Sequence, residues 1–193
     1  MSTIINGSSP SVTFSDSTTQ TTAFTTTPVI NTINSQASTP LTLGINGTEQ
    51  MRISSAGIIT TPNNSAFIAY MSASSTATTI PFNTVFLNRG GTYNTSTYTF
   101  VAPVTGLYNF NLIISWDGTG SAPSANYISL YVNGARTRDM FEANSWSTNT
   151  EIHSSALLYL TASDSVTVYN SGSANIQGGN NLYYSQWSGY SVG

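Results

Sequence analysis

The run from Gly106 to Trp116 constrains the fold most, because every second residue in it is large and mostly apolar. These residues are Tyr108, Phe110, Leu112, Ile114 and Trp116. Successive side chains of a β-strand point to opposite faces, so this spacing places all five on one face of a sheet. We expect that face to be buried. Pro103 and Gly106 come just before the run and predict a turn between two strands.

The second half of the chain repeats this pattern as short strands separated by turn residues, which is typical of an antiparallel sandwich. No window shows a helical periodicity. We expect strands near residues 66–73, 80–88, 96–101, 106–116, 126–133, 151–160, 164–170 and 182–191.

The order of strand, Ala-Pro-x-x-Gly turn and Gly-x-Tyr-x-Phe resembles the globular head of complement component 1q and its tumour-necrosis-factor-like relatives. Further marks of this family are Leu158-Tyr-Leu160, Asp164-Ser-Val-Thr-Val168 and the closing Trp187-Ser-Gly-Tyr190. The chain departs from the pattern at Ser163, where the family usually has Gly, and it has no collagen-like Gly-X-Y stalk. The resemblance implies an all-β, antiparallel jelly-roll head that forms a trimer and serves assembly and recognition.

Large aromatic residues of the head are candidates for contacts between the three subunits. We expect the Tyr- and Trp-rich sheets to bury aromatic area there, at about 25 cal/mol for each Å2 removed from water. Trp116 is expected either in the core or along the trimer axis. The interface candidates are Tyr108, Phe110, Trp187 and Tyr190.

The composition excludes several partners. Charged residues make up 6% of the chain, the four basic residues are all arginines, and the formal net charge is −3. Nucleic-acid binding and polybasic membrane contacts need clustered basic residues, so we expect neither. No apolar run is long enough to span a membrane, no cysteine is present, and the first residues do not resemble a secretory signal.

The first 62 residues are poor in large apolar side chains. The segment from Ser11 to Phe24 resembles a string that recurs in bacteriophage tail fibres and adhesins. Asn46-Gly47 between alternating apolar residues predicts a hairpin, and its Met51-Arg-Ile53 strand resembles phage fibre stalks. An isolated hairpin is marginal in water, so we expect it to pack against copies of itself. We therefore predict an extended anchor at 1–27, a short β-rich trimeric stalk at 28–62 and a jelly-roll head at 63–193.

Catalytic chemistry finds little support. His153 is the one histidine in the chain, no Gly-x-Ser-x-Gly elbow accompanies it, and the seven acidic residues are scattered. We predict that the chain is not an enzyme and that it has no catalytic residue, no cofactor and no metal site. The calcium site that some family members have near the apex finds no matching acidic cluster.

Two groups of residues are candidates for ligand binding. Trp146 lies among polar residues, and an exposed indole beside amides suits a sugar ring; packing of Trp146 over an edge or on a neighbouring subunit remains open. The candidates of this group are Asn144, Trp146, Asn149 and Tyr183. The second group is the charged run from Arg136 to Glu142, interpreted either as a ligand or subunit contact, or as a solvated turn after Asn133-Gly134.

The resemblances predict a structural protein of a virion that is assembled in the host cytoplasm. In the first hypothesis the chain is a short trimeric fibre or spike whose residues 1–27 bind other virion proteins. Its head contacts a host surface glycan or protein through loops 117–126, 139–150 and 171–182. In the alternative hypothesis the chain is a capsid-decorating or cement protein that is held on the shell by its N-terminal segment.

Overall fold

The computed structural model describes residues 38–116, 126–143, 151–172, 175–179 and 184–192, and the backbone of residues 4–5, 12–13 and 19–20. All regular elements in these residues are β-strands. This part of the chain contains no helix that is long and apolar enough to cross a membrane.

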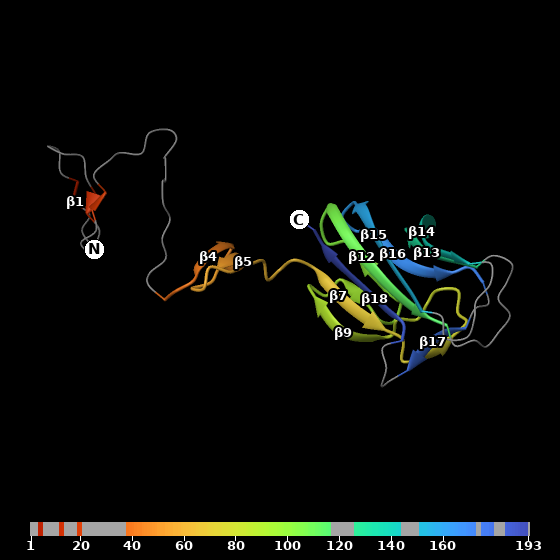
Figure 1. Ribbon diagram of the computed structural model, residues 1–193. Coiled ribbons are helices and arrows are strands. Elements are labelled where there is room, and N and C mark those ends of the chain that lie inside the picture. Colours follow the sequence, from red (N-terminus) through yellow and green to blue (C-terminus); the bar gives the residue numbers. More distant parts are fainter. Residues whose placement is uncertain are drawn as a thin grey trace. The chain divides into compact units, whose positions relative to one another are not determined.

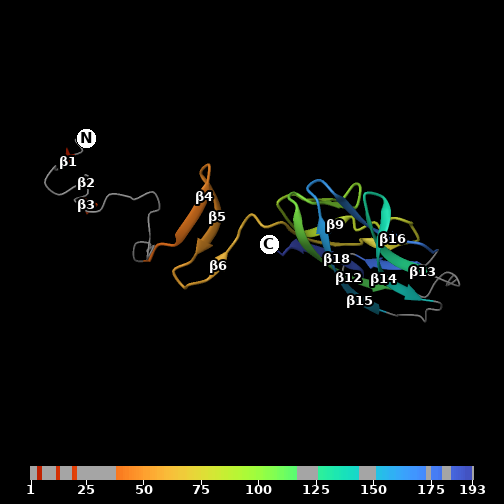
Figure 2. The same cartoon turned by 90° about the horizontal axis from the view of Figure 1, so that it is seen from above.

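The head is a sandwich of two five-stranded sheets (Figures 1 and 2). The first sheet has the order β15 (Glu151–Leu160), β12 (Gly106–Ser115), β18 (Gln186–Ser191), β7 (Ala66–Tyr70) and β9 (Thr84–Arg89). The second has the order β10 (Tyr93–Asn94), β11 (Thr99–Val101), β16 (Ser165–Asn170), β13 (Asn126–Val132) and β14 (Ala135–Ala143). A small sheet pairs β17 (Ile176–Gly179) with β8 (Ala73–Ser75). All these neighbours are antiparallel, which confirms the predicted all-β sandwich.

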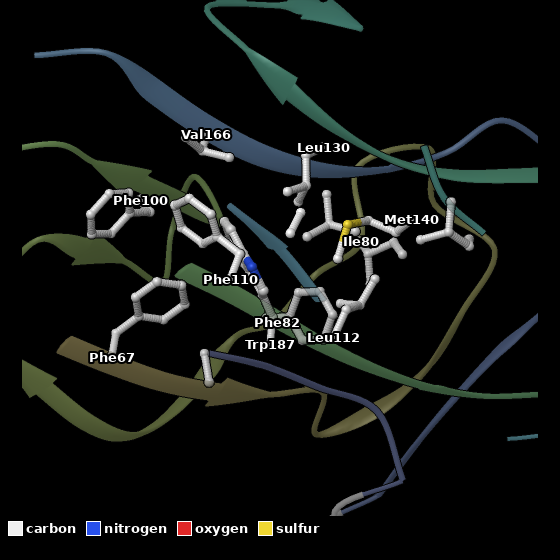
Figure 3. Close-up of a cluster of buried hydrophobic side chains, with 14 of the residues drawn as sticks. Phe67, Ile80, Phe82, Phe100, Phe110, Leu112, Leu130, Met140, Val166 and Trp187 are labelled. Carbon is white, nitrogen blue, oxygen red and sulfur yellow. The ribbon is translucent and has the colours of Figure 1, made fainter. Parts of the chain in front are cut away.

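An aromatic core fills the space between the sheets (Figure 3). As predicted from the alternating run, its five large residues are all buried, and Trp116 is 2% exposed. The Phe67 ring stacks on Tyr93 at 4.8 Å between centroids and meets the edge of Trp187 at 4.8 Å. The Tyr93 hydroxyl donates to the carbonyl of Phe82 at 2.8 Å, and burial raises the pKa of this phenol far above its usual range. The core therefore joins both sheets through stacked and edge-on rings, and the polar end of Tyr93 has its partner inside it.

The absence of a side chain at Gly189 allows two aromatic rings to pack against the backbone of β18. A Cβ built on it would lie 2.7 Å from ring atoms of both Phe67 and Phe110. Carbon atoms are in good contact near 3.5–4.0 Å, so a side chain at this position would push both rings apart. The close approach explains why the final strand reads Trp187-Ser-Gly-Tyr190.

The structure differs from the predicted strands mainly at β14, which the sequence prediction omits. Its charged residues favoured a solvated turn, but they lie on an edge strand, where charged side chains discourage pairing with other chains. Asn133 and Gly134 have φ of 51° and 79°, as the type I′ hairpin turn requires. The same Asn-Gly signal that indicates the 46–47 hairpin was therefore also present here.

Three turns are linked at one end of the sandwich. Asn133 Nδ2 donates to Asp164 Oδ1 at 2.7 Å, and the amide of Thr161 donates to Asp164 Oδ2 at 2.7 Å. Ala102 exchanges backbone hydrogen bonds with Ser163 and Asp164. Ser163 adopts φ of 75°, so this serine accepts the left-handed conformation that glycine usually provides.

The N-terminal residues form separate small sheets. β4 (Leu41–Ile45), β5 (Thr48–Ile53) and β6 (Ile59–Thr60) form one sheet in that order. Asn46 and Gly47 have φ of 51° and 77°, which confirms the predicted hairpin turn. The backbone pairs β1 (Ile4–Ile5), β2 (Val12–Thr13) and β3 (Thr19–Gln20) form a second sheet.

Gly189→Ala is expected to lower the free energy of unfolding by about 1–3 kcal/mol, because the methyl group overpacks the core at two rings. Urea unfolding followed by Trp fluorescence measures the change. Gly179→Ala is the matched control, since a Cβ there meets only the Tyr184 ring at 3.5 Å, an ordinary contact. Equal stability of the two variants would contradict the packing role of Gly189.

Ser163→Gly is expected to raise the free energy of unfolding by roughly 1 kcal/mol, because glycine removes the steric cost of a positive φ. Ala162→Gly, one residue earlier and outside the positive-φ positions, is expected to lower it by about 0.5–1 kcal/mol through unfolded-state entropy. Thermal unfolding of both variants measures the opposite signs. A loss of stability in Ser163→Gly would show that the serine side chain is needed at this turn.

Candidate functional site

The four predicted ligand residues, Asn144, Trp146, Asn149 and Tyr183, lie outside the described residues. The same is true of loop 117–125. The predicted binding end is therefore described only at the residues that border these segments.

Three of the four predicted interface residues lie in the core of a single chain. Tyr108, Phe110 and Trp187 are each 0% exposed, so their side chains have no surface left to offer to another subunit. Their size and alternation are compatible with a core as well as with an interface, and in the structure they belong to the core. Tyr190 is 47% exposed on the outer face of the first sheet and remains an interface candidate.

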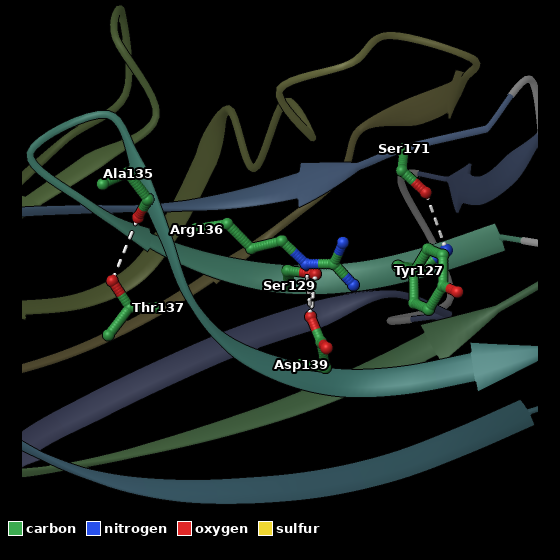
Figure 4. Close-up of polar contacts among 7 residues, drawn as sticks. All are labelled: Tyr127, Ser129, Ala135, Arg136, Thr137, Asp139 and Ser171. Atoms are coloured by element: carbon green, nitrogen blue, oxygen red, sulfur yellow. Dashed lines mark hydrogen bonds and ion pairs between the residues drawn. The ribbon is translucent and has the colours of Figure 1, made fainter.

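The charged run forms an ordered cluster with residues of the neighbouring strand (Figure 4). Arg136 Nε and Ser129 Oγ both donate to Asp139 Oδ1, at 2.7 Å each. The Arg136 guanidinium also lies 4.2 Å from the centre of the Tyr127 ring. We call Tyr127, Ser129, Arg136 and Asp139 the Arg136 cluster. It lies on the outer face of the second sheet, opposite the face that carries the buried Ile128 and Leu130.

Charge and hydrogen bonding stabilise the ionised forms in this cluster. The bond from Arg136, followed by that from Ser129, holds the pKa of Asp139 below its usual range. The bond to Asp139 raises the pKa of Arg136 further, and a hydrogen bond with Glu142 raises the pKa of Tyr127. Within the described part of the chain, Asp139 Oδ2 accepts no hydrogen bond. A ligand hydroxyl could therefore donate to it.

One end of the Arg136 cluster, at Tyr127, lies beside the predicted binding loops. Tyr127 follows residues 117–125, and its amide donates to Ser171 Oγ at 2.8 Å. Ser171 in turn donates its own amide to the Tyr127 carbonyl at 3.0 Å and leads into the third loop. Glu142 precedes the second loop. On the same face, the rings of Tyr131 and Tyr169 stack at 4.3 Å.

Sequence reasoning singled out Arg136 and Asp139 but missed Tyr127 and Ser129. Both alternate with the apolar Ile128 and Leu130, so the period of two places them on the outer face of the strand. Recognising β14 as the partner strand would have brought them beside the charged residues. Because the β13–β14 hairpin was not predicted, two of the four residues of the cluster were not predicted either.

His153 pairs with Glu151 at 2.5 Å between Nε2 and Oε1, and its side chain is 65% exposed. Both residues lie on the edge strand β15. Among the described residues, no group of three or more His, Cys, Asp or Glu side chains could hold a metal ion. The contact at His153 joins two exposed side chains, and such surface contacts contribute little to stability.

Solved structures similar to this chain share its sandwich fold. The globular domain of zebrafish complement 1qA is 18% identical, covering 67% of this chain and 98% of that chain, with a TM-score of 0.49. Murine APRIL at pH 8.5 is 14% identical, covering 67% and 99%, with a TM-score of 0.50. Eiger TNF from S. frugiperda is 14% identical, covering 67% and 92%, with a TM-score of 0.47. No curated protein sequence matches the chain at a significant level.

The two sheets and the alternating core define an antiparallel jelly-roll sandwich of the C1q and TNF type. The model of the C1q domain family matches residues 66–192. The chain belongs to the C1q domain family. Domains of this type are commonly trimeric, bind partners and are non-enzymatic.

The free energy of unfolding is expected to fall as the pH decreases below about 4, the usual pKa of Asp. The folded state depresses the pKa of Asp139, so the stabilisation is present above the unfolded pKa and is lost as the pH falls through the folded one. Asp139→Asn and Arg136→Gln should both reduce this slope, as measured by urea unfolding between about pH 2 and pH 6. An unchanged slope in both variants would show that the ion pair does not contribute.

Proposed function

We propose that the chain forms a homotrimeric, non-enzymatic binding head on a virion fibre or spike. The head contacts a host surface glycan or protein through the Arg136 cluster and the loops beside it. The family supplies the first support, because C1q- and TNF-like domains commonly form trimers and bind partners.

Exposed apolar side chains support the trimer. In the single chain, Leu43 and Ile45 of the β4–β5 hairpin are 51% and 66% exposed. On the outer face of the first sheet, the exposed large side chains include Leu157, Tyr159 and Tyr190. Exposed large apolar side chains grouped on one face can mark an interaction site. Association of three copies would remove these side chains from water.

The observation that carries the binding function is the Arg136 cluster, whose Tyr127 lies beside the predicted loops. Its arginine is held on one side by Asp139 and on the other by the Tyr127 ring, so its orientation is set before a ligand binds. An aromatic ring, a guanidinium and a carboxylate, one of whose oxygens accepts no hydrogen bond from the described residues, are groups that bind the faces and hydroxyls of sugars.

The virion part of the proposal rests on the sequence. Residues 11–24 and the strand containing Met51-Arg-Ile53 resemble segments of phage fibres and stalks, and residues 1–27 would contact other virion proteins. Imaging intact particles would locate the chain. Outward-pointing heads on the tail would support the fibre, whereas many copies across the capsid would favour the decoration protein. Absence of the chain from the particles would contradict both.

Arg136→Ala is expected to weaken binding of the full chain to its glycan or host surface at least about tenfold, because the guanidinium orients both Tyr127 and Asp139. A glycan array followed by binding measurements on whole host cells checks this.

Arg138→Ala is the matched control on the same strand. Arg138 pairs with Leu130 in the register of the strands, and its side chain donates no hydrogen bond to the described residues of the cluster. Equal binding by both variants and the parent chain would show that the ligand does not use the Arg136 cluster. Failure of the parent chain to bind any host surface would contradict the attachment function itself.

A further inference from the structure

A hollow lies on the outer face of the first sheet, away from the Arg136 cluster. It has a volume of about 430 Å3 and is lined by residues of β18, β7 and β9. We define the hollow by Ala66, Ile68, Leu87, Arg89, Ser188 and Tyr190. A cavity of roughly 150 Å3 already holds a benzene molecule, so the hollow has room for an aromatic side chain.

The opposite edge of the same sheet carries two projecting side chains. Tyr159 and Leu157 lie on β15 and are 73% and 53% exposed. Tyr159 is the most exposed of the large hydrophobic side chains in the described part of the chain. The sheet therefore has two different surfaces on the same face. Exposed side chains project at the β15 edge, and the hollow lies toward the β9 edge.

Leu157 and the hollow lie at the same level along the strands, and Tyr159 lies two residues farther along β15, opposite Leu107. The register aligns Leu157 with Asn109, Asn109 with Tyr190, Tyr190 with Ala66, and Ala66 with Arg89. Rotation about an axis parallel to these strands keeps the level unchanged. It therefore brings β15 of one copy to the height of the hollow on the next. Two different patches joined in this way form a head-to-tail interface, which closes into a ring if the rotation closes.

We propose that Tyr159 of each copy fills the hollow of the next copy, so that three such contacts close the trimer. This inference rests on the proposed trimer and names the residues that hold it together. A second copy's Tyr159 would place its ring at the end of the hollow that is lined by Asn64, Ala66 and Arg89, while Leu157 beside it packs on Tyr190.

Arg89 offers a partner for the polar end of Tyr159. Its Nε donates to the Asn64 carbonyl at 2.7 Å, which holds the side chain at the rim of the hollow. Its terminal nitrogens make no hydrogen bond to other described residues and can donate to the phenol oxygen. Tyrosine suits such a site, since its ring is apolar and its hydroxyl needs a partner when it is buried.

Cysteine cross-linking tests the contact directly, because the chain has no cysteine of its own. The double variant Tyr159→Cys/Arg89→Cys is treated with a short bismaleimide and separated on a denaturing gel. Within one chain the two positions are separated by β12, β18 and β7, or about 19 Å at the usual strand spacing, so a short linker joins only different copies. We expect covalent dimers and trimers. Tyr159→Cys/Thr167→Cys, with its second thiol on the other sheet, is the matched control and should stay monomeric on the gel.

Sedimentation velocity of the parent chain tests the trimer separately from the contact between Tyr159 and the hollow. A monomer would overturn both the trimer and the contact. A double variant that still sediments as a trimer but does not cross-link would overturn the contact alone. Cross-linked dimers from Tyr159→Cys without a second cysteine would also overturn it, because they would place Tyr159 against its own copy.

Tyr159→Ala provides a second test that needs no cross-linking. The side chain is exposed in the single chain, so its truncation should leave the fold intact and raise the dissociation constant of the trimer at least about tenfold. Val104→Ala removes a side chain that is 60% exposed in the turn before β12 and should leave the constant unchanged. Equal dissociation constants for the two variants would contradict the proposal.

Discussion

The packing of aromatic rings across Gly189 is the contact on which the rest of the head depends. Phe67 and Phe110 approach the backbone of β18 more closely than any side chain at position 189 would allow. Trp187, on the same strand, meets the edge of Phe67 at 4.8 Å. Because these rings come from three neighbouring strands and reach Phe100 of the second sheet, they set the order of the first sheet and its distance from the second.

A core of this kind leaves the two outer faces free for different tasks. The face of the second sheet carries the Arg136 cluster, where a guanidinium is held between a carboxylate and a ring. The face of the first sheet carries the hollow and the projecting side chains of β15. In the trimer that we propose, the first sheet makes the assembly and the second sheet stays open to a partner. The low charge of the chain fits this division, since the cluster pairs one arginine with one aspartate and the hollow is lined mainly by uncharged side chains.

Alternation was enough to predict the core strands, because large residues at a period of two fit a strand with one buried face and do not fit a helix. The stretch from Tyr108 to Trp116 illustrates this. The same information could not distinguish a core from an interface, and three aromatic residues assigned to the trimer lie inside the chain. Strand β14 escaped prediction because its charges outweigh its pattern, although Asn133-Gly134 marked the hairpin. The grouping of Tyr127 with Arg136 depends on pairing between strands, which no local pattern contains.

The hydrogen bonds of Asn133 have a consequence for the chemical lifetime of the protein. Asparagine followed by glycine is the pair most prone to lose its side-chain amide, and here that amide donates to Asp164 at 2.7 Å. Deamidation would replace the donor by a second carboxylate and set two negative charges against each other between the β13–β14 and β15–β16 turns. Deamidation of this one side chain would thus turn an attraction between two turns into a repulsion, while the strands on either side stay chemically unchanged.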